Sequence, residues 1–462
     1  MDTAPEGGVR QNTGDQARIG PITLMPGIPP REVFVFLLVT GIAVMMTAFI
    51  ALMQPYVFTE MVGVPRAEQG RLAGQLMTVQ QAVVLVCVGF AGALADRIGR
   101  RAMVIFALVG YSMAAFAYPL AGGVAALFVI RFCFGIASSA HTAGGPPRFF
   151  DYVDNASRGR FMALVMVFYG LISVLMVGVI GAALPGWLHS AGYDTALAGT
   201  YALWACGILG LGAALVAAMF LMPDAPKADR RKGAAPVSQS MRELLGGFRR
   251  VVAHARTNRR FGVLLLTSFV VRTDEAVVGS FLALWITLRG AQEGLGTTGT
   301  VAIAGTALAL MRACSFVIPP ILGVLLDKWD RTAIYVASLV LVGVSFLCAP
   351  LVTSVTGWEI LALALFIGIA ESTQTIAQQA FFGQEAPADL RGTAYGLLAF
   401  FGTASVVLVS LASGYLFDLV GLTAPFVLIG LLHVIFSALA IGYLALGRTA
   451  DNPITDATGV TG

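Results

Sequence analysis

The sequence predicts an all-α membrane protein with twelve transmembrane helices, arranged as two pseudo-symmetric six-helix bundles. Of the 462 residues, 57 % are hydrophobic and 12 % are charged, and the charged share is about half that of soluble domains. The apolar residues gather in segments of roughly 20 residues, the length that an α-helix needs to cross a bilayer core. The two halves of the chain also carry matching motifs. Lipid, rather than water, is therefore the expected solvent.

The predicted spans form two groups of six. The first bundle covers residues 32–222 and the second covers residues 261–446. A basic cytoplasmic linker, 223–260, separates them, and polar tails flank them at 1–31 and 447–462. The N-terminal tail lacks the apolar core of a signal peptide, so we expect a flexible cytoplasmic segment. The predicted spans are 33–55, 72–95, 102–120, 123–143, 160–184, 198–222, 261–288, 301–326, 332–350, 358–380, 393–417 and 424–446.

The distribution of Lys and Arg predicts the orientation. With the N-terminus inside, the predicted cytoplasmic segments hold 23 of the 29 basic residues, and the central linker alone holds ten of them. The predicted outer loops hold only Arg66, Arg71 and Arg289. Because short cytoplasmic loops carry an excess of basic residues, we expect both termini in the cytoplasm and the protein in the inner (cytoplasmic) membrane. Topology thus explains the net charge of +4, and no nucleic-acid partner is expected.

The composition argues against an enzyme or a metalloprotein. The five cysteines lie in apolar runs, and none forms a CxxC pair or a cluster with histidine at metal-ligand spacing. None of the three lysines follows a phosphate-binding glycine pattern, and no nucleophile is paired with a base. We therefore expect no catalytic residue, no metal site and no cofactor.

Two sequence echoes relate the halves. The stretch Gly92–Arg101 reads GALADRIGRR after span two, and Gly323–Arg331 reads GVLLDKWDR after span eight. A Phe-Phe dipeptide followed by Arg-Gly occurs at 149–159, before span five, and again at 381–392, before span eleven. Both echoes have nearly the same offset, and such duplicated halves are typical of secondary transporters.

The stretch Gly92–Arg101 resembles the signature of the major facilitator superfamily, G-x-L-a-D-R-x-G-R-R, and its degenerate copy lies where that family has one. Arg131 and Gly135 in span four resemble a second motif, R-x-x-x-G, found in many proton-coupled members. The resemblance covers essentially the whole chain and implies the twelve-helix fold of that family. A glycine- and proline-rich motif that marks many exporters is poorly matched in span five, so the direction of transport stays open.

The resemblance also implies a role for the signature loop. In that family it is a charge latch that stabilises the outward-facing state. The residues to which the resemblance assigns this role are Gly92, Asp96, Arg97, Gly99, Arg100 and Arg101, with Asp327 and Arg331 in the second copy. The alternative is that the arginines only set the topology. An aspartate at the negative end of helix two favours the latch, because topology alone does not require that unfavourable charge.

Six charged residues lie within the predicted spans and away from their ends. Each costs roughly 2.5–3.5 kcal/mol at the bilayer centre, so we expect them to pair and to have a function. Most lie near the middle of spans seven, eight and ten, the depth at which secondary transporters bind substrate. We predict a substrate and proton-coupling site formed by Arg131, Arg272, Asp274, Glu275, Arg312 and Glu371, with the amides Gln374 and Gln378.

Helical geometry suggests how these charges pair. Arg272 and Glu275 are three residues apart in span seven, so they share a helical face and can pair. Asp274 then points about 100° away and is either a free carboxylate or the partner of Arg312. Amides at Gln374, Gln378, Gln54, Gln80 and Gln81 could contact substrate or link helices to one another.

The sequence thus favours a monomeric secondary transporter of a small organic solute, with protons as the coupling ion and the lipid bilayer as its surroundings. Arg272 and Arg312 favour an organic anion, because guanidinium groups bind carboxylates. The three carboxylates leave open proton-driven efflux of cationic or drug-like compounds. A non-transporting receptor or assembly protein on the same fold is the alternative from a different class, since fold does not determine function.

Overall fold

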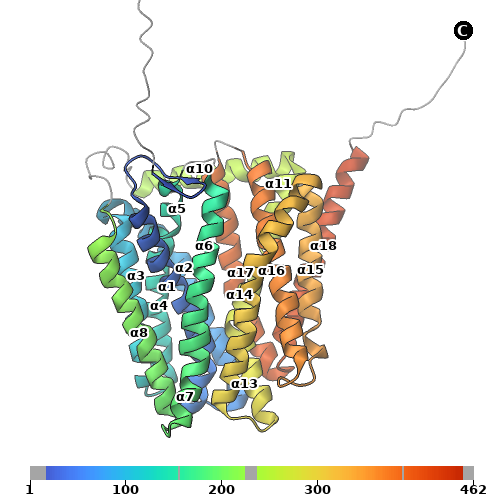
Figure 1. Cartoon of the computed structure of the whole chain (residues 1–462). Helices are drawn as coiled ribbons and strands as arrows, with labels where there is room; N and C mark the ends of the chain where they lie inside the picture. The colour runs from blue at the N-terminus through green and yellow to red at the C-terminus, as the bar shows by residue number, and fades with distance from the viewer. Residues whose placement is uncertain (1–16, 154–156, 224–236, 388–389, 451–462) are drawn as a thin grey trace, which may run out of the picture.

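The computed structural model describes residues 17–153, 157–223, 237–387 and 390–450. In this part of the chain the long helices run side by side as one bundle (Figure 1). Eleven helices among the described residues are long and apolar enough to cross a membrane. The remaining predicted span, 261–288, is also helical but is divided by a turn at 268–272. The prediction of an all-helical membrane fold is confirmed.

The first half contains eight helices among the described residues. They are α1 (Pro30–Tyr56), α2 (Gln69–Ile98), α3 (Arg100–Ala117), α4 (Val124–Gly144), α5 (Pro146–Tyr152), α6 (Arg158–Ser173), α7 (Leu184–Ser190) and α8 (Thr195–Phe220). A π-helical segment, Val174–Ala183, joins α6 to α7, so these three pieces form one span. Helix α4 packs on α2 and α3, and α8 packs on α1 and α3.

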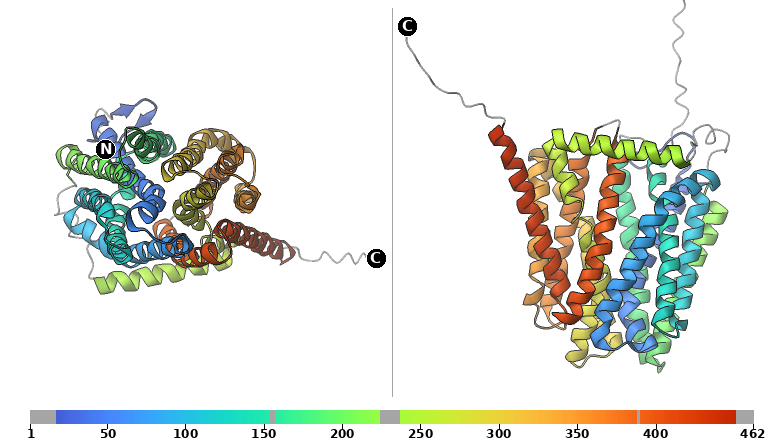
Figure 2. Two further views of the ribbon diagram at one scale, coloured as in Figure 1. Left: turned by 90° about the horizontal axis from the view of Figure 1, so that it is seen from below. Right: turned by 180° about the vertical axis from the view of Figure 1, so that it is seen from behind.

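The second half repeats this plan. Its helices are α11 (Arg259–Thr267), α12 (Thr273–Val277), α13 (Ala283–Gln292), α14 (Thr297–Lys328), α15 (Arg331–Leu347), α16 (Trp358–Glu385), α17 (Arg391–Leu419) and α18 (Ala424–Ala450). Helix α16 packs on α14 and α15, and α18 packs on α15 and α11. Figure 2 shows the two groups of helices next to each other, viewed along the bundle.

The two ends of the bundle differ. Helix α10 (Val237–Thr257) lies across one end, roughly perpendicular to the spans, and runs along one side of both groups of helices (Figure 2). The described chain also begins and finishes at this end, which we call the α10 end. Helices α7 and α13 lie at the opposite end, which we call the α13 end.

Helix α10 corrects the expectation that 223–260 is only a polar linker. Its described side chains are amphipathic: Val251 and Ala255 are buried against the second half, whereas Arg249 and Arg250 are exposed. A search for segments of about 20 apolar residues does not find such a helix, because half of its surface is charged. Residues 224–236 of the predicted linker lie outside the described residues.

The N-terminal segment 17–29, which we call the N-terminal strap, corrects the expectation of a flexible tail. It contains a two-stranded hairpin, β1 (Arg18–Ile19) and β2 (Ile22–Thr23), and its Leu24 is fully buried. The backbone N–H of Met25 donates to the Tyr152 carbonyl at 3.0 Å, and that of Thr23 donates to the Ser157 hydroxyl at 3.0 Å. Its partners are more than 120 residues away, so no local pattern could have predicted them. Residues 1–16 lie outside the described part.

Candidate functional site

The two halves are in close contact toward the α13 end. Helix α2 packs along α17, and α14 packs on the segment Val174–Ala183. A Cβ atom on Gly74 would collide with the Ser410 carbonyl oxygen, so glycine is what allows α2 and α17 to approach each other there. Toward the α10 end of the same two helices, a Cβ atom on Gly92 or Gly396 would meet no atom of the described residues within 4 Å. The contact between the halves is therefore tight at one end and loose at the other.

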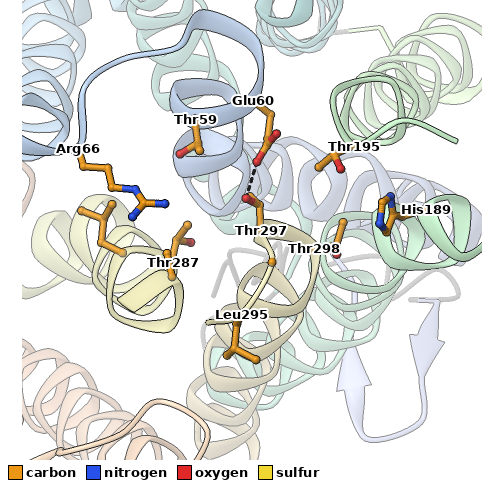
Figure 3. A pocket seen from close by; sticks show the side chains of 12 residues that line it. Thr59, Glu60, Arg66, His189, Thr195, Thr287, Leu295, Thr297 and Thr298 are labelled. Carbon is orange, nitrogen blue, oxygen red and sulfur yellow. Dashed lines mark hydrogen bonds between the residues drawn. The ribbon is translucent and has the colours of Figure 1, made fainter. Parts of the chain in front are cut away.

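A polar pocket of about 290 Å³ lies where the halves meet at the α13 end (Figure 3). Residues Glu60, Arg66 and His189 come from the first half, and Thr287 and Thr297 come from the second. The Thr297 hydroxyl donates a hydrogen bond to the Glu60 carboxylate across the interface. This bond adds to the contacts that hold the α13 end together.

Span seven is interrupted close to its middle. Helix α11 ends at Thr267, a turn covers 268–272, and α12 begins at Thr273. Three hydroxyls bond to nearby carbonyls: Thr267 to Val263 at 2.8 Å, Ser268 to Leu265 at 2.7 Å and Thr273 to Val270 at 2.6 Å. Hydroxyls compete in this way with the helical ladder, which gives a local reason for the break. Discontinuous helices of this kind form ion and substrate sites in transporters.

The predicted pairing of Arg272 with Glu275 stays a prediction, although the break changes the helical geometry on which it was based. Arg272 lies in the turn before α12, so a continuous helix does not relate the two residues. The Arg272 guanidinium donates to the Thr403 hydroxyl of α17 at 3.2 Å. Asp274 is 7 % exposed and lies in the first turn of α12, where the helix end favours a negative charge. The side chain of Glu275 lies outside the described residues.

Arg312 of span eight and Glu371 of span ten lie at the same depth in the bundle. The Ser315 and Ser372 hydroxyls are 3.3 Å apart and set the register of α14 against α16. Arg312 lies about one turn from Ser315, and Glu371 is next to Ser372. Arg312 is exposed, and in the described part of the chain no carboxylate, Asp274 included, lies within ion-pair distance of it. The predicted alternative pairing of Arg312 with Asp274 is therefore not made here.

The amides of span ten have different surroundings. Gln374 is buried, and its amide nitrogen lies 3.4 Å from Nε2 of His433 on α18. The other ring nitrogen of His433 lies 3.0 Å from the Ile429 carbonyl oxygen. Gln378 lies one turn farther along α16 and makes no hydrogen bond within the described residues.

Arg131 is the buried cation of the first half. It is 4 % exposed and donates to the Gln80 side-chain oxygen at 2.7 Å and to the Gln54 side-chain oxygen. Its guanidinium also lies over the rings of Tyr118 and Phe134, 5.7 and 5.8 Å from their centroids. No carboxylate of the described chain lies within ion-pair distance. Neutral amides and rings thus hold a full positive charge, although burying an uncompensated charge is costly.

The signature loop makes its described contacts within the first half. Gly99 has φ of +95°, a conformation that glycine adopts easily, and it forms the tight turn between α2 and α3. Arg100 pairs with Asp151, and Arg101 donates to the Ala218 carbonyl. Asp96 and Arg97 are exposed and make no described contact with the second half. In the second copy, the side chain of Asp327 lies outside the described residues, and Arg331 begins α15.

Sequence reasoning missed three polar residues that link helices. His433 lies in the middle of span twelve, and a search for titratable residues within spans would have found it. Thr403 gives no such signal, because hydroxyls are common in spans. Asp418 was overlooked as a loop residue at the end of span eleven, yet its carboxylate bonds to the backbone of α2.

Comparison with known proteins gives one family across the chain. The model of the Major Facilitator Superfamily matches residues 35–315 and 264–459. Magnetosome protein MamH of Paramagnetospirillum magneticum is 24 % identical over 412 residues, which cover 87 % of this chain and 89 % of MamH. Magnetosome protein MamZ of the same organism is 22 % identical, and the match covers 93 % of this chain but only 65 % of MamZ.

Solved structures show the same fold. The nucleoside transporter NupG superposes with a TM-score of 0.66 at 11 % identity, covering 90 % of this chain and 99 % of NupG. A POT family transporter in complex with 5-aminolevulinic acid gives 0.65 at 13 % identity, covering 92 % and 97 %. A bacterial homologue of the lysosomal transporter Spinster, solved in an inward-facing and unoccupied conformation, gives 0.62 at 15 % identity, covering 92 % and 98 %.

Proposed function

This chain belongs to the major facilitator superfamily, and we propose that it is a secondary active transporter that moves a small organic solute by alternating access, driven by protons. The observation that carries the proposal is the unequal contact between the halves: glycine-mediated packing at the α13 end and open space beside Gly92 and Gly396 at the α10 end. A transporter that is closed on one side of the membrane and open on the other has this geometry. With the α10 end in the cytoplasm, as the basic residues predict, the state is open to the cytoplasm.

Proton coupling is supported by the interrupted span seven. Asp274 is buried beside a helix break that also contains Arg272, and Arg272 is tied to α17 through Thr403. A movement of α17 relative to α12 would change the distance between this guanidinium and the carboxylate. The carboxylate would then bind a proton with different affinity in the two states, and a difference of this kind is what couples a proton to transport.

An organic anion is the substrate class that the charges favour. Arg131 in the first half and Arg312 in the second have no carboxylate partner among the described residues. Guanidinium groups bind carboxylates through two parallel hydrogen bonds. A substrate that carries a carboxylate could compensate either cation when the state that exposes it is formed.

The test is transport by the purified protein in proteoliposomes. A panel of organic anions, neutral metabolites and cationic drug-like compounds would be assayed for uptake and for efflux, with and without a pH gradient. Gradient-driven movement of an anion supports the proposal. Gradient-driven efflux of cations would establish the drug-export alternative, and no movement of any compound by folded protein would favour the non-transporting class.

We propose the cytoplasmic membrane as the location, with both termini inside. The names of the relatives MamH and MamZ make a magnetosome membrane the alternative to test. Membrane fractionation followed by detection of a tagged chain distinguishes the two locations.

A further inference from the structure

Helices α2 and α17 form an antiparallel pair across the interface between the halves. Asp418, near the end of α17, lies at the beginning of α2, and Val407 lies opposite Thr78, nine residues into α2. The end of α2 accordingly lies at the α10 end of the molecule, where α17 begins. Each helix therefore directs its C-terminus toward the N-terminus of its partner in the other half.

The Asp418 carboxylate caps α2 from the other half. Its two oxygens accept hydrogen bonds from the backbone N–H groups of Gly70, at 2.9 Å, and Arg71, at 2.7 Å. Helix α2 has no side-chain cap of its own, because Glu68 at its N-cap makes no such bond. The first N–H groups of a helix have no partner within the helix and carry a partial positive charge, so an anionic acceptor there is favourable.

The position of Asp418 within its own helix is unfavourable. It lies in the last turn of α17, where the partial negative charge of the helix opposes a carboxylate. The position becomes favourable only when the N-terminus of α2 is adjacent. Gly70 makes that approach possible, since a Cβ atom there would collide with the side chains of Phe417 and Asp418.

Asp96 has the corresponding position at the α10 end. It lies in the last turn of α2, is exposed, and has no described partner in this state. Helix α17 begins after Leu390, whose side chain cannot cap it. The antiparallel packing therefore relates two junctions: Asp418 with the start of α2, which is closed here, and Asp96 with the start of α17, which is open.

We propose that Asp418 is a second latch, which holds the α13 end closed and opposes the Asp96 latch at the α10 end. The inference rests on the proposed alternating access, because a latch needs two states to choose between. Each carboxylate caps a helix in only one state, so each shifts the equilibrium toward the state in which its junction is closed. The Glu60–Thr297 hydrogen bond adds a second contact between the halves that breaks when the α13 end opens.

The test measures the state directly and needs no substrate. In a background without native cysteines, spin labels at Ser190 and Gln292 report the separation of the halves at the α13 end. Labels at Thr142 and Gln384 report it at the α10 end. We expect Asp418→Asn to move the equilibrium constant about tenfold toward the state with an open α13 end, because the negative charge is lost and only one acceptor oxygen remains for the two N–H groups. Gly70→Ala should shift it in the same direction without removing the charge.

Asp194→Asn is the matched control. Asp194 also caps a helix at the α13 end, accepting from the Ala196 N–H at 3.1 Å, but both residues belong to the first half. Its substitution should leave both distance distributions unchanged.

The double variant separates a latch from simple destabilisation. Asp96→Asn should favour the state seen here, and Asp96→Asn combined with Asp418→Asn should return the equilibrium toward that of the wild type. If Asp418→Asn leaves the distances unchanged while the wild-type protein responds to a pH change or to substrate, the latch is overturned and transport stands. If no variant or condition produces a second set of distances, alternating access itself fails, and the latch fails with it.

Discussion

At the scale of single residues, the structure separates two kinds of buried charge. Arg131 is fixed by Gln54 and Gln80, whose oxygens both point at one guanidinium. Asp274 lies at a helix break, where small changes of the backbone alter its surroundings. The first arrangement suits recognition of an anion, and the second suits a group that changes its protonation between states.

We expect Asp274→Asn to abolish the stimulation of transport by a pH gradient while substrate exchange without a gradient continues. Asparagine keeps the shape of the side chain but cannot bind or release a proton. Gradient-driven uptake and counterflow measured on the same proteoliposomes would test this, with Asp194→Asn as a control for loss of a surface carboxylate. If Glu371→Gln loses the stimulation and Asp274→Asn keeps it, the coupling site lies on α16.

Arg131→Lys should reduce transport of an anionic substrate about tenfold while the protein stays folded. An ammonium group cannot reach both amides with the geometry of a guanidinium. Leaving one buried amide without its partner costs about 1–3 kcal/mol. Counterflow rates and size-exclusion profiles are the measurements, and Arg289→Lys, which changes a partly exposed arginine at the α13 end, is the control. Wild-type rates for Arg131→Lys would leave Arg131 a purely structural role.

At the scale of elements, two segments depart from regular spans. Span seven is broken by hydroxyl-to-carbonyl hydrogen bonds around 267–273, and the N-terminal strap is held to the loop between α5 and α6. Glu32, at the start of α1, accepts hydrogen bonds from the Tyr152 hydroxyl at 2.7 Å and from the Met222 N–H at 2.8 Å. The strap thus lies beside a buried polar junction of three segments at the α10 end.

Leu24→Ala should release the N-terminal strap. Leu24 is fully buried, and removal of such a side chain costs roughly 2–5 kcal/mol. We expect trypsin to cleave the variant faster after Arg18 and Arg31, which mass spectrometry of the digest would detect. Met25→Ala is the control, because the neighbouring Met25 side chain is 42 % exposed. Equal cleavage rates for the two variants would contradict the docking of the strap.

At the scale of the whole molecule, the orientation in the membrane decides which of the two ends faces the cytoplasm. The α10 end carries the central basic stretch, and the α13 end carries the polar pocket between the halves. The state described here is open to the cytoplasm only if the α10 end faces it.

We expect reporter fusions to place residue 240 and both termini in the cytoplasm, because 23 of the basic residues lie in segments predicted to face it. Labelling of a cysteine introduced at Gln292 by an impermeant reagent in intact cells should place the α13 end outside. An external signal from residue 240 would invert the orientation.

The sequence by itself determined the all-helical membrane fold and the family to which the chain belongs. These properties depend on apolar length and on local motifs, and neighbouring residues carry that information. The tertiary structure decided the partners: Arg272 meets Thr403, Arg131 meets Gln54 and Gln80, and Asp418 meets a helix 348 residues away. It also decided which end of the molecule is closed. The physical reason is that such contacts depend on how the halves pack, and residues far apart in the sequence carry no local signal of that packing.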